Sequence, residues 1–131
     1  MEYSIKQEEQ YSVFALKDEN LNSIIAPELK SKLVLLSSEG TKNLILDLSD
    51  VKFVDSSGLS AILTGNRLWN KDNGSFVLTG IKHASVKKLI EISRLDTVLT
   101  LVPTVSESID YVMMEELQRE LNSDELDDPS L

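Results

Sequence analysis

Residues 44–63 read LILDLSDVKFVDSSGLSAIL, a run that changes character near its middle. Asn43–Leu48 is apolar almost throughout, which indicates a strand buried on both faces at the centre of a helix-covered sheet. After Asp55-Ser56-Ser57-Gly58 the apolar residues recur at helical spacing, which predicts a helix from Ser57 to about Asp72. The residues expected to face inward from it are Leu59, Ile62 and Leu63.

Two short segments open the chain, around residues 3–5 and 11–15, and apolar and polar residues alternate in both. This alternation is typical of strands with one buried face, so the pair predicts a β-hairpin. A first helix should follow, with Asn22 or Ser23 as its cap, Pro27 in its first turn and Gly40 after its end. Its apolar stripe consists of Ile25, Leu29, Leu33 and Leu36.

Strands and helices continue to alternate after residue 72. Strands are predicted at Ser75–Thr79 and Val98–Val102, with a helix up to Leu95 between them that His83 caps. A last helix should begin at Thr104, because Thr104 and Glu107 have the separation of a capping box. Its expected inward residues are Val105, Ile109, Val112 and Met113.

This order of elements predicts an α/β layer structure with a mixed sheet of about five strands, in which an N-terminal hairpin precedes parallel strands packed with about four helices. One domain is expected over residues 1–114, with the last helix extending to about residue 121. Residues 122–131 are acidic and poor in apolar side chains, so we expect a disordered tail there.

The composition restricts the possible partners. The chain has 131 residues and a formal net charge of −9. From Met114 onward the sequence has seven acidic residues and one basic residue, Arg119. Scattered Lys and Arg argue against a nucleic-acid partner. The sequence has no cysteine, no apolar run of membrane-spanning length and no signal-peptide pattern at Met1–Lys6, so a cytoplasmic protein without membrane insertion is expected.

Catalytic and cofactor-binding patterns are missing. His83 is the single histidine, and no Gly-x-Ser-x-Gly elbow, phosphate-binding Gly-x-x-x-x-Gly-Lys loop or Gly-x-Gly-x-x-Gly fingerprint occurs. The acidic C-terminal residues lack the spaced ligand loop of a calcium site. We therefore expect no catalytic residue, metal or cofactor, and a nucleotide-binding or weakly hydrolytic domain is the least favoured alternative.

The run Phe53–Leu59 places Asp-Ser-Ser-Gly-Leu at the start of a helix that follows a buried strand. Three further segments accompany it, namely Leu46–Val51, Ala26–Lys30, and Val86–Ile90 with Ser93 and Leu95 after it. Together they resemble the sulfate transporter and anti-sigma factor antagonist (STAS) domain family, and within it the free-standing bacterial anti-sigma factor antagonists. The resemblance extends from about Tyr3 to Met113 and implies a regulatory binding module rather than an enzyme.

The resemblance implies that Ser57, the hydroxyl residue before the glycine, is the phosphoacceptor, and that Ser56 orients it or occasionally substitutes for it. The partners would be an anti-sigma factor serine kinase, which binds the unphosphorylated antagonist, and a phosphatase, which resets it. Phosphate adds about −1.5 to −2 charges at neutral pH, which opposes a packed interface next to Asp55. The missing side chain of Gly58 should leave room for the partner. The expected partner-binding residues are Asp55, Ser56, Ser57, Gly58, Ser60, Arg67 and Asn22.

Two positions depart from the family pattern, because many members have aspartate in place of Asn22 and glycine in place of Arg94. Two alternatives also stay open. Asp and Ser are preferred helix caps, so Ser57 can have a purely structural role. A STAS domain can also be a non-phosphorylated scaffold subunit of a lipid-transport or stress-signalling assembly. In either case a monomer or weak dimer is expected.

Overall fold

The structure is a computed structural model that describes residues 1–127, with the side chains of residues 1–123. Its strands and helices alternate along the chain as the sequence predicts. In chain order the elements are β1 (Tyr3–Gln7), β2 (Ser12–Leu16), β3 (Asn20–Leu21), α1 (Ala26–Ser38), β4 (Leu44–Asp47), β5 (Phe53–Val54), α2 (Ser56–Lys71), β6 (Phe76–Thr79), α3 (Ala84–Ile92), the 3₁₀ helix η1 (Leu95–Thr97), β7 (Thr100–Val102) and α4 (Val105–Asp127).

Five strands form the main sheet in the order β1-β2-β4-β6-β7. β1 and β2 pair antiparallel, with Tyr3 opposite Leu16, whereas β2, β4, β6 and β7 run parallel. Helices connect the parallel strands, because strands that run the same way need a crossover. The predicted α/β layer structure, with a hairpin, parallel strands and four α-helices in residues 1–127, is confirmed.

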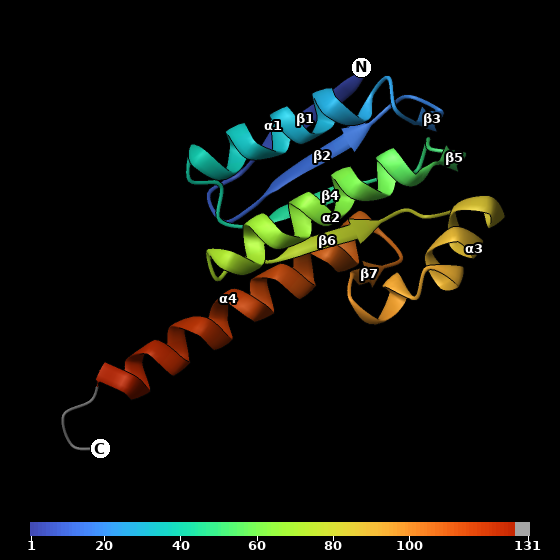
Figure 1. Cartoon of the computed structure of the whole chain (residues 1–131). Coiled ribbons are helices and arrows are strands. Elements are labelled where there is room, and N and C mark those ends of the chain that lie inside the picture. Colours follow the sequence, from blue (N-terminus) through green and yellow to red (C-terminus); the bar gives the residue numbers. More distant parts are fainter. Residues whose placement is uncertain (128–131) are drawn as a thin grey trace.

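Different helices cover the two faces of the sheet (Figure 1). On one face α1 and α2 cover Leu44 and Leu46, and on the other Val112 of α4 packs in a cluster with Ile45 and Val77. Successive residues of β4 are therefore buried on opposite faces, which explains why the strand is apolar throughout.

A second sheet, formed by β3 and β5, was not predicted. The two strands pair in parallel, with Asn20 opposite Phe53 and Leu21 opposite Val54. The Glu19 carbonyl accepts hydrogen bonds from the backbone N–H groups of residues 52 and 53, at 2.7 and 3.1 Å. Each strand has only two residues and so leaves no periodicity in the sequence. This small sheet fixes the backbone that enters α2.

The inward face of α2 differs from the prediction at Leu59, which is only half-buried and lies outside the core clusters. Ile62 is buried and Leu63 is partly buried against the core, as expected. The buried face of α2 is rich in small residues, which let the helix lie close to the sheet. Such residues add little to a hydrophobic pattern, so the sequence did not reveal this face. The buried residues of α2 are Gly58, Ala61, Ile62, Gly65, Asn66 and Trp69.

The last helix also differs from the prediction. Met113 is 43% exposed, because the buried face of α4 continues from Val112 to Glu116 and Arg119. The helix extends to Asp127 instead of ending near residue 121, since neither Gly nor Pro occurs between Val105 and Pro129. Residues 122–127, part of the expected disordered tail, are therefore helical, and residues 128–131 lie outside the described residues.

A buried polar cluster holds α4 against the sheet. The Asn43 side-chain amide donates to Glu116 Oε1 at 3.0 Å, and its Oδ1 accepts from Arg119 at 2.9 Å and from the Ser75 backbone N–H at 2.8 Å. Arg119 and Glu116 form an ion pair at 2.9 Å. We call Asn43, Ser75, Glu116 and Arg119 the α4 clasp.

Within residues 1–127, none of the helices combines the length and apolar character that a membrane crossing requires.

Candidate functional site

The site predicted from the sequence lies where β5 passes into α2. Asp55 has extended backbone (φ −101°, ψ −173°), and its Oδ1 accepts a hydrogen bond from the Gly58 backbone N–H at 2.9 Å. Its carbonyl accepts from the Leu59 N–H at 2.9 Å, the first hydrogen bond of the helix. Asp55 is therefore the N-cap, and the helix begins at Ser56, one residue earlier than predicted.

Gly58 is buried against the chain's own second sheet. A Cβ at this position would lie 2.5 Å from the Leu21 carbonyl oxygen and 2.8 Å from Val54 Cγ1. The space beside the missing side chain is thus occupied by β3 and β5, so the expectation that Gly58 leaves room for a partner is wrong. Its role is to let α2 start in direct contact with the strands.

Ser57 occupies the second helical position, half-buried, and Ser56 before it is exposed. Within the part of the chain that the structure describes, the Ser57 hydroxyl makes no hydrogen bond that meets standard geometry. Ser56, Ser57 and Ser60 line a hollow of about 300 Å³ between the starts of α1 and α2, which we call the serine hollow. Its other lining residues are Ser23, Ala26, Pro27 and Lys30.

The structure brings some of the predicted residues together and separates others. Asn22 lies beside the hollow's Ser23, and its Oδ1 accepts from the Ile24 backbone N–H at 3.0 Å. It thereby caps the turn before α1, whose N-cap residue is Ile25 without a side-chain bond. Arg67 shares the face of α2 that carries Ser57 and Ser60, but ten residues of helix place it about 15 Å from Ser57.

Three residues near the starts of α1 and α2 were not singled out from the sequence. Ile24, which follows Ser23 of the hollow, is 85% exposed, and Phe53 of β5, three residues before Ser56, is 60% exposed. Lys30 reaches the hollow from α1. The sequence could have indicated Ile24, because this apolar residue follows the polar pair Asn22-Ser23 just before the predicted helix.

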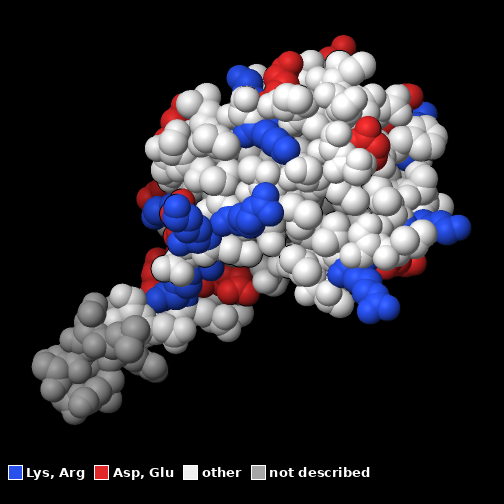
Figure 2. Space-filling model, viewed as in Figure 1, with Lys and Arg blue, Asp and Glu red and all other residues white. Residues whose placement is uncertain are grey.

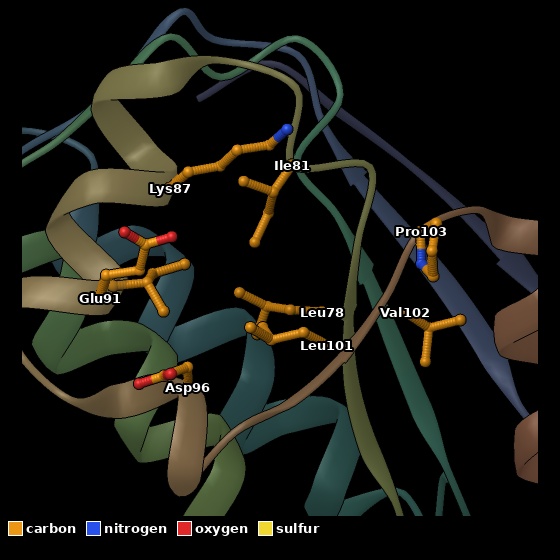
Figure 3. A pocket seen from close by; sticks show the side chains of 9 residues that line it. Leu78, Ile81, Lys87, Glu91, Asp96, Leu101, Val102 and Pro103 are labelled. Carbon is orange, nitrogen blue, oxygen red and sulfur yellow. The ribbon is translucent and has the colours of Figure 1, made fainter.

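A second hollow, of about 330 Å³, lies between α3, η1 and the edge strand β7 (Figure 3). Leu78, Ile81 and Leu101 form its apolar part, while the side chains of Lys87, Glu91 and Asp96 stand around it. It shares no lining residue with the serine hollow. His83 occupies the N-cap position of α3, as predicted, but its side chain makes no capping bond.

The charges on the surface are mixed. Figure 2 shows Lys and Arg intermixed with Asp and Glu over the face in view, with uncharged surface between them. Among the described residues, no three His, Cys, Asp or Glu side chains gather as a metal site would require. The features of the site are a capped helix start, a hydroxyl with no hydrogen-bond partner among the described residues, and the exposed Ile24 nearby.

Comparison with solved structures reveals the same fold in other proteins. The protein TM1081 from Thermotoga maritima has a TM-score of 0.75 at 24% identity, over 85% of this chain and 94% of that one. An anti-sigma factor antagonist from Mycobacterium paratuberculosis has a TM-score of 0.74 at 20% identity, over 86% and 93%. The phosphorylated form of SpoIIAA, a Bacillus cell fate determinant, has a TM-score of 0.66 at 20% identity, over 85% and 99%.

The model of the STAS domain family matches residues 3–108, which is most of the chain and includes the serine hollow, β1 to β7 and the start of α4. This match and the shared fold agree with the resemblance carried by Phe53–Leu59. The chain belongs to the STAS domain family.

Proposed function

We propose that this chain is an anti-sigma factor antagonist, which binds an anti-sigma factor serine kinase until that kinase phosphorylates Ser57. It is a binding module and not an enzyme. The Ser57 hydroxyl carries the proposal, because it lies at a surface hollow with no hydrogen bond to a described residue. A kinase can transfer a phosphoryl group to it without breaking an internal contact.

The position of Ser57 also suits a reversible charge. The N-terminus of α2 is the positive end of a 16-residue helix, so phosphate there is stabilised in the free protein. In a packed complex the same phosphate would be desolvated beside the Asp55 carboxylate, which raises its cost. Phosphorylation would therefore leave the fold intact and weaken the complex.

The relatives support this function. Solved structures with the same fold include SpoIIAA in unphosphorylated and phosphorylated forms, described as an anti-sigma factor antagonist and as a cell fate determinant. By this analogy the second partner is a phosphatase that restores Ser57, and the system operates in the bacterial cytoplasm.

The contact surface we propose extends beyond the predicted polar residues. Exposed Ile24 supplies apolar area next to Ser23 of the serine hollow, and exposed Phe53 supplies more on β5, which leads into α2. Asp55, Ser56, Ser60 and Asn22 supply polar groups. Apolar side chains of this size often dominate binding energy when a partner buries them. Gly58 acts indirectly by holding the start of α2, and Arg67 extends the surface along the helix.

Titration calorimetry against the anti-sigma factor serine kinase from the same genome, with nucleotide present, tests the proposal. We expect Ser57→Ala to bind as wild type does and never to be released. Ser57→Asp should bind at least about tenfold more weakly, a smaller loss than phosphate causes because it adds one charge instead of nearly two. Ser106→Asp is a matched control, because Ser106 is an exposed serine at the second position of another helix, α4, and should leave binding unchanged.

Equal affinity of wild type, Ser57→Ala and Ser57→Asp would contradict the switch. Intact-mass measurement of the protein purified from its own organism, with and without phosphatase treatment, provides an independent check. Absence of phosphate under all growth conditions would favour the scaffold subunit of a lipid-transport or stress-signalling assembly.

A further inference from the structure

The C-terminal half of α4 carries an apolar stripe that the domain leaves uncovered. Met113, Met114, Leu117 and Leu121 are 43, 59, 49 and 55% exposed. With Asp110 they follow the spacing i, i+3, i+4, i+7, i+11, which places them on one side of the helix. Val112 and Arg119 lie on the opposite, sheet-facing side, and Glu116 lies between the two sides.

Part of this stripe forms the wall of a groove. A hollow of about 580 Å³ is lined by Met113, Met114 and Leu117 of α4 and by Gln10 of the turn between β1 and β2. Figure 1 shows α4 continuing past the end of the sheet, where no other drawn element runs alongside it. The stripe therefore begins on the body of the domain and continues along the free part of the helix.

The charges beside the groove have one sign. Its remaining lining residues are Asp110, Glu116 and Glu120, and among the described residues that line it there is neither Lys nor Arg. Arg119, the basic residue of α4, is held in the clasp by Glu116, Asn43 and Ser75. A second copy of this chain would bring like carboxylates together, whereas a basic partner would pair with them.

We propose that the stripe and its groove bind a basic amphipathic segment of another protein, which inserts apolar side chains between Met113, Met114 and Leu117 and pairs its Lys or Arg with Asp110 and Glu120. Methionine suits this role because its unbranched side chain adapts to differently shaped partners. The surface is separate from the serine hollow, so the domain can hold this partner irrespective of the state of Ser57.

The test uses a helical peptide of about 18 residues built from leucine and lysine, with leucines at i, i+3, i+4 and i+7, titrated into the full chain. The matched peptide has glutamate in place of lysine. We expect the lysine peptide alone to bind. In a ¹H–¹³C spectrum it should shift the methyl resonances of Met113 and Met114 and leave that of Met1 unchanged.

Paired variants distinguish apolar contact with the stripe from general attraction of the lysine peptide to the negative charge of the chain. Leu117→Ser should weaken binding by at least about tenfold, while Leu35→Ser, which changes an equally exposed leucine on α1, should have no effect. Asp110→Asn combined with Glu120→Gln should weaken binding and reduce its salt dependence, whereas Glu91→Gln combined with Asp96→Asn should not.

Equal affinity for the Leu117→Ser and Leu35→Ser variants would overturn the proposal, since binding would then reflect net charge alone. Binding of the glutamate peptide would also overturn it. A dimer detected by light scattering that Leu117→Ser abolishes would show that a second copy, not a basic partner, covers the stripe.

Discussion

At the start of α2 the capping bond belongs to Asp55, while the Ser57 hydroxyl has no partner in the part of the chain that the structure describes. Asp55→Ala should lower the free energy of unfolding by about 0.5–2 kcal/mol, because the Gly58 N–H loses its acceptor. Asp55→Asn keeps a capping oxygen and should change stability less. Urea denaturation of the variants measures the difference.

Ser57→Ala is the internal comparison for this prediction. Ser57 supplies no capping bond, so its removal should change the free energy of unfolding by less than about 0.5 kcal/mol. A loss as large as that of Asp55→Ala would contradict the assignment of the cap and would reopen the purely structural role of Ser57.

Arg94 follows α3 in the left-handed conformation, with φ 58° and ψ 25°. A residue with a Cβ is destabilised by about 1–2 kcal/mol in this conformation, whereas glycine is not. Glycine loses more backbone freedom on folding, and this loss offsets part of the gain from the substitution. Arg94→Gly should therefore raise the free energy of unfolding by up to about 1 kcal/mol. The departure from the family's usual glycine thus has a conformational cost.

Thermal melts of Arg94→Gly and Arg67→Gly distinguish the effect of backbone conformation from that of charge, because both substitutions remove one arginine but only residue 94 is left-handed. Arg67 lies within α2, where glycine should destabilise by about 1 kcal/mol. Destabilisation by both substitutions would refute the left-handed assignment at residue 94.

Among the secondary-structure elements, helix α2 allows a comparison between two apolar residues three positions apart. Ile62 is 1% exposed in the main core, whereas Leu59 is half-buried outside it. Ile62→Ala should lower the free energy of unfolding by about 2–5 kcal/mol, and Leu59→Ala should cost clearly less. Chemical denaturation of both variants tests this, and the reverse ranking would mean that α2 is rotated from the orientation described.

The α4 clasp gives stability a dependence on pH. Desolvation raises the pKa of Glu116, but hydrogen bonds from Asn43 and Arg119 lower it more, so its pKa lies below the ordinary value. The stabilisation from Glu116 is therefore complete above the unfolded-state pKa of about 4.3 and is lost as the pH falls through the lower folded-state pKa.

Wild type should thus lose melting temperature more steeply than Glu116→Gln between about pH 5 and pH 3. Melts across this range measure the difference in slope. Glu120→Gln, which changes an exposed carboxylate outside the clasp, should keep the wild-type slope. Parallel curves for wild type and Glu116→Gln would show that the clasp does not couple stability to protonation.

Elements with a long apolar pattern were predictable from the sequence, and those built on small or polar residues were not. The strand at Leu44–Asp47 follows from its continuous apolar run, and the helix after Asp55 follows from the helical spacing of its apolar residues. The β3–β5 pair is too short to have a period, and the clasp joins Asn43 to Arg119 across 76 positions. Likewise the sequence places Ser57 at a helix start, but only folding brings Lys30 and Ser23 to the same hollow.

For the whole molecule, the contacts of α4 show how much of the C-terminus the fold requires. Arg119 is the last residue in the clasp, and residues 120–123 are exposed. Deletion of residues 122–131 should therefore leave the melting temperature within a few degrees, as judged by calorimetry. Deletion from residue 113 onward removes the clasp and should cause a large loss. A non-cooperative transition in the shorter deletion would show that the last ten residues contribute to the packed core.

The strand order β1-β2-β4-β6-β7 follows the order in which a ribosome makes the strands. Each new strand and its helix can add to the growing edge during translation, without waiting for later sequence. The exception is the face formed by Ile45 and Val77, because Val112 of α4 covers it. That face stays open until α4 has been made, so it is where a chaperone at the ribosome would be needed to protect the nascent chain.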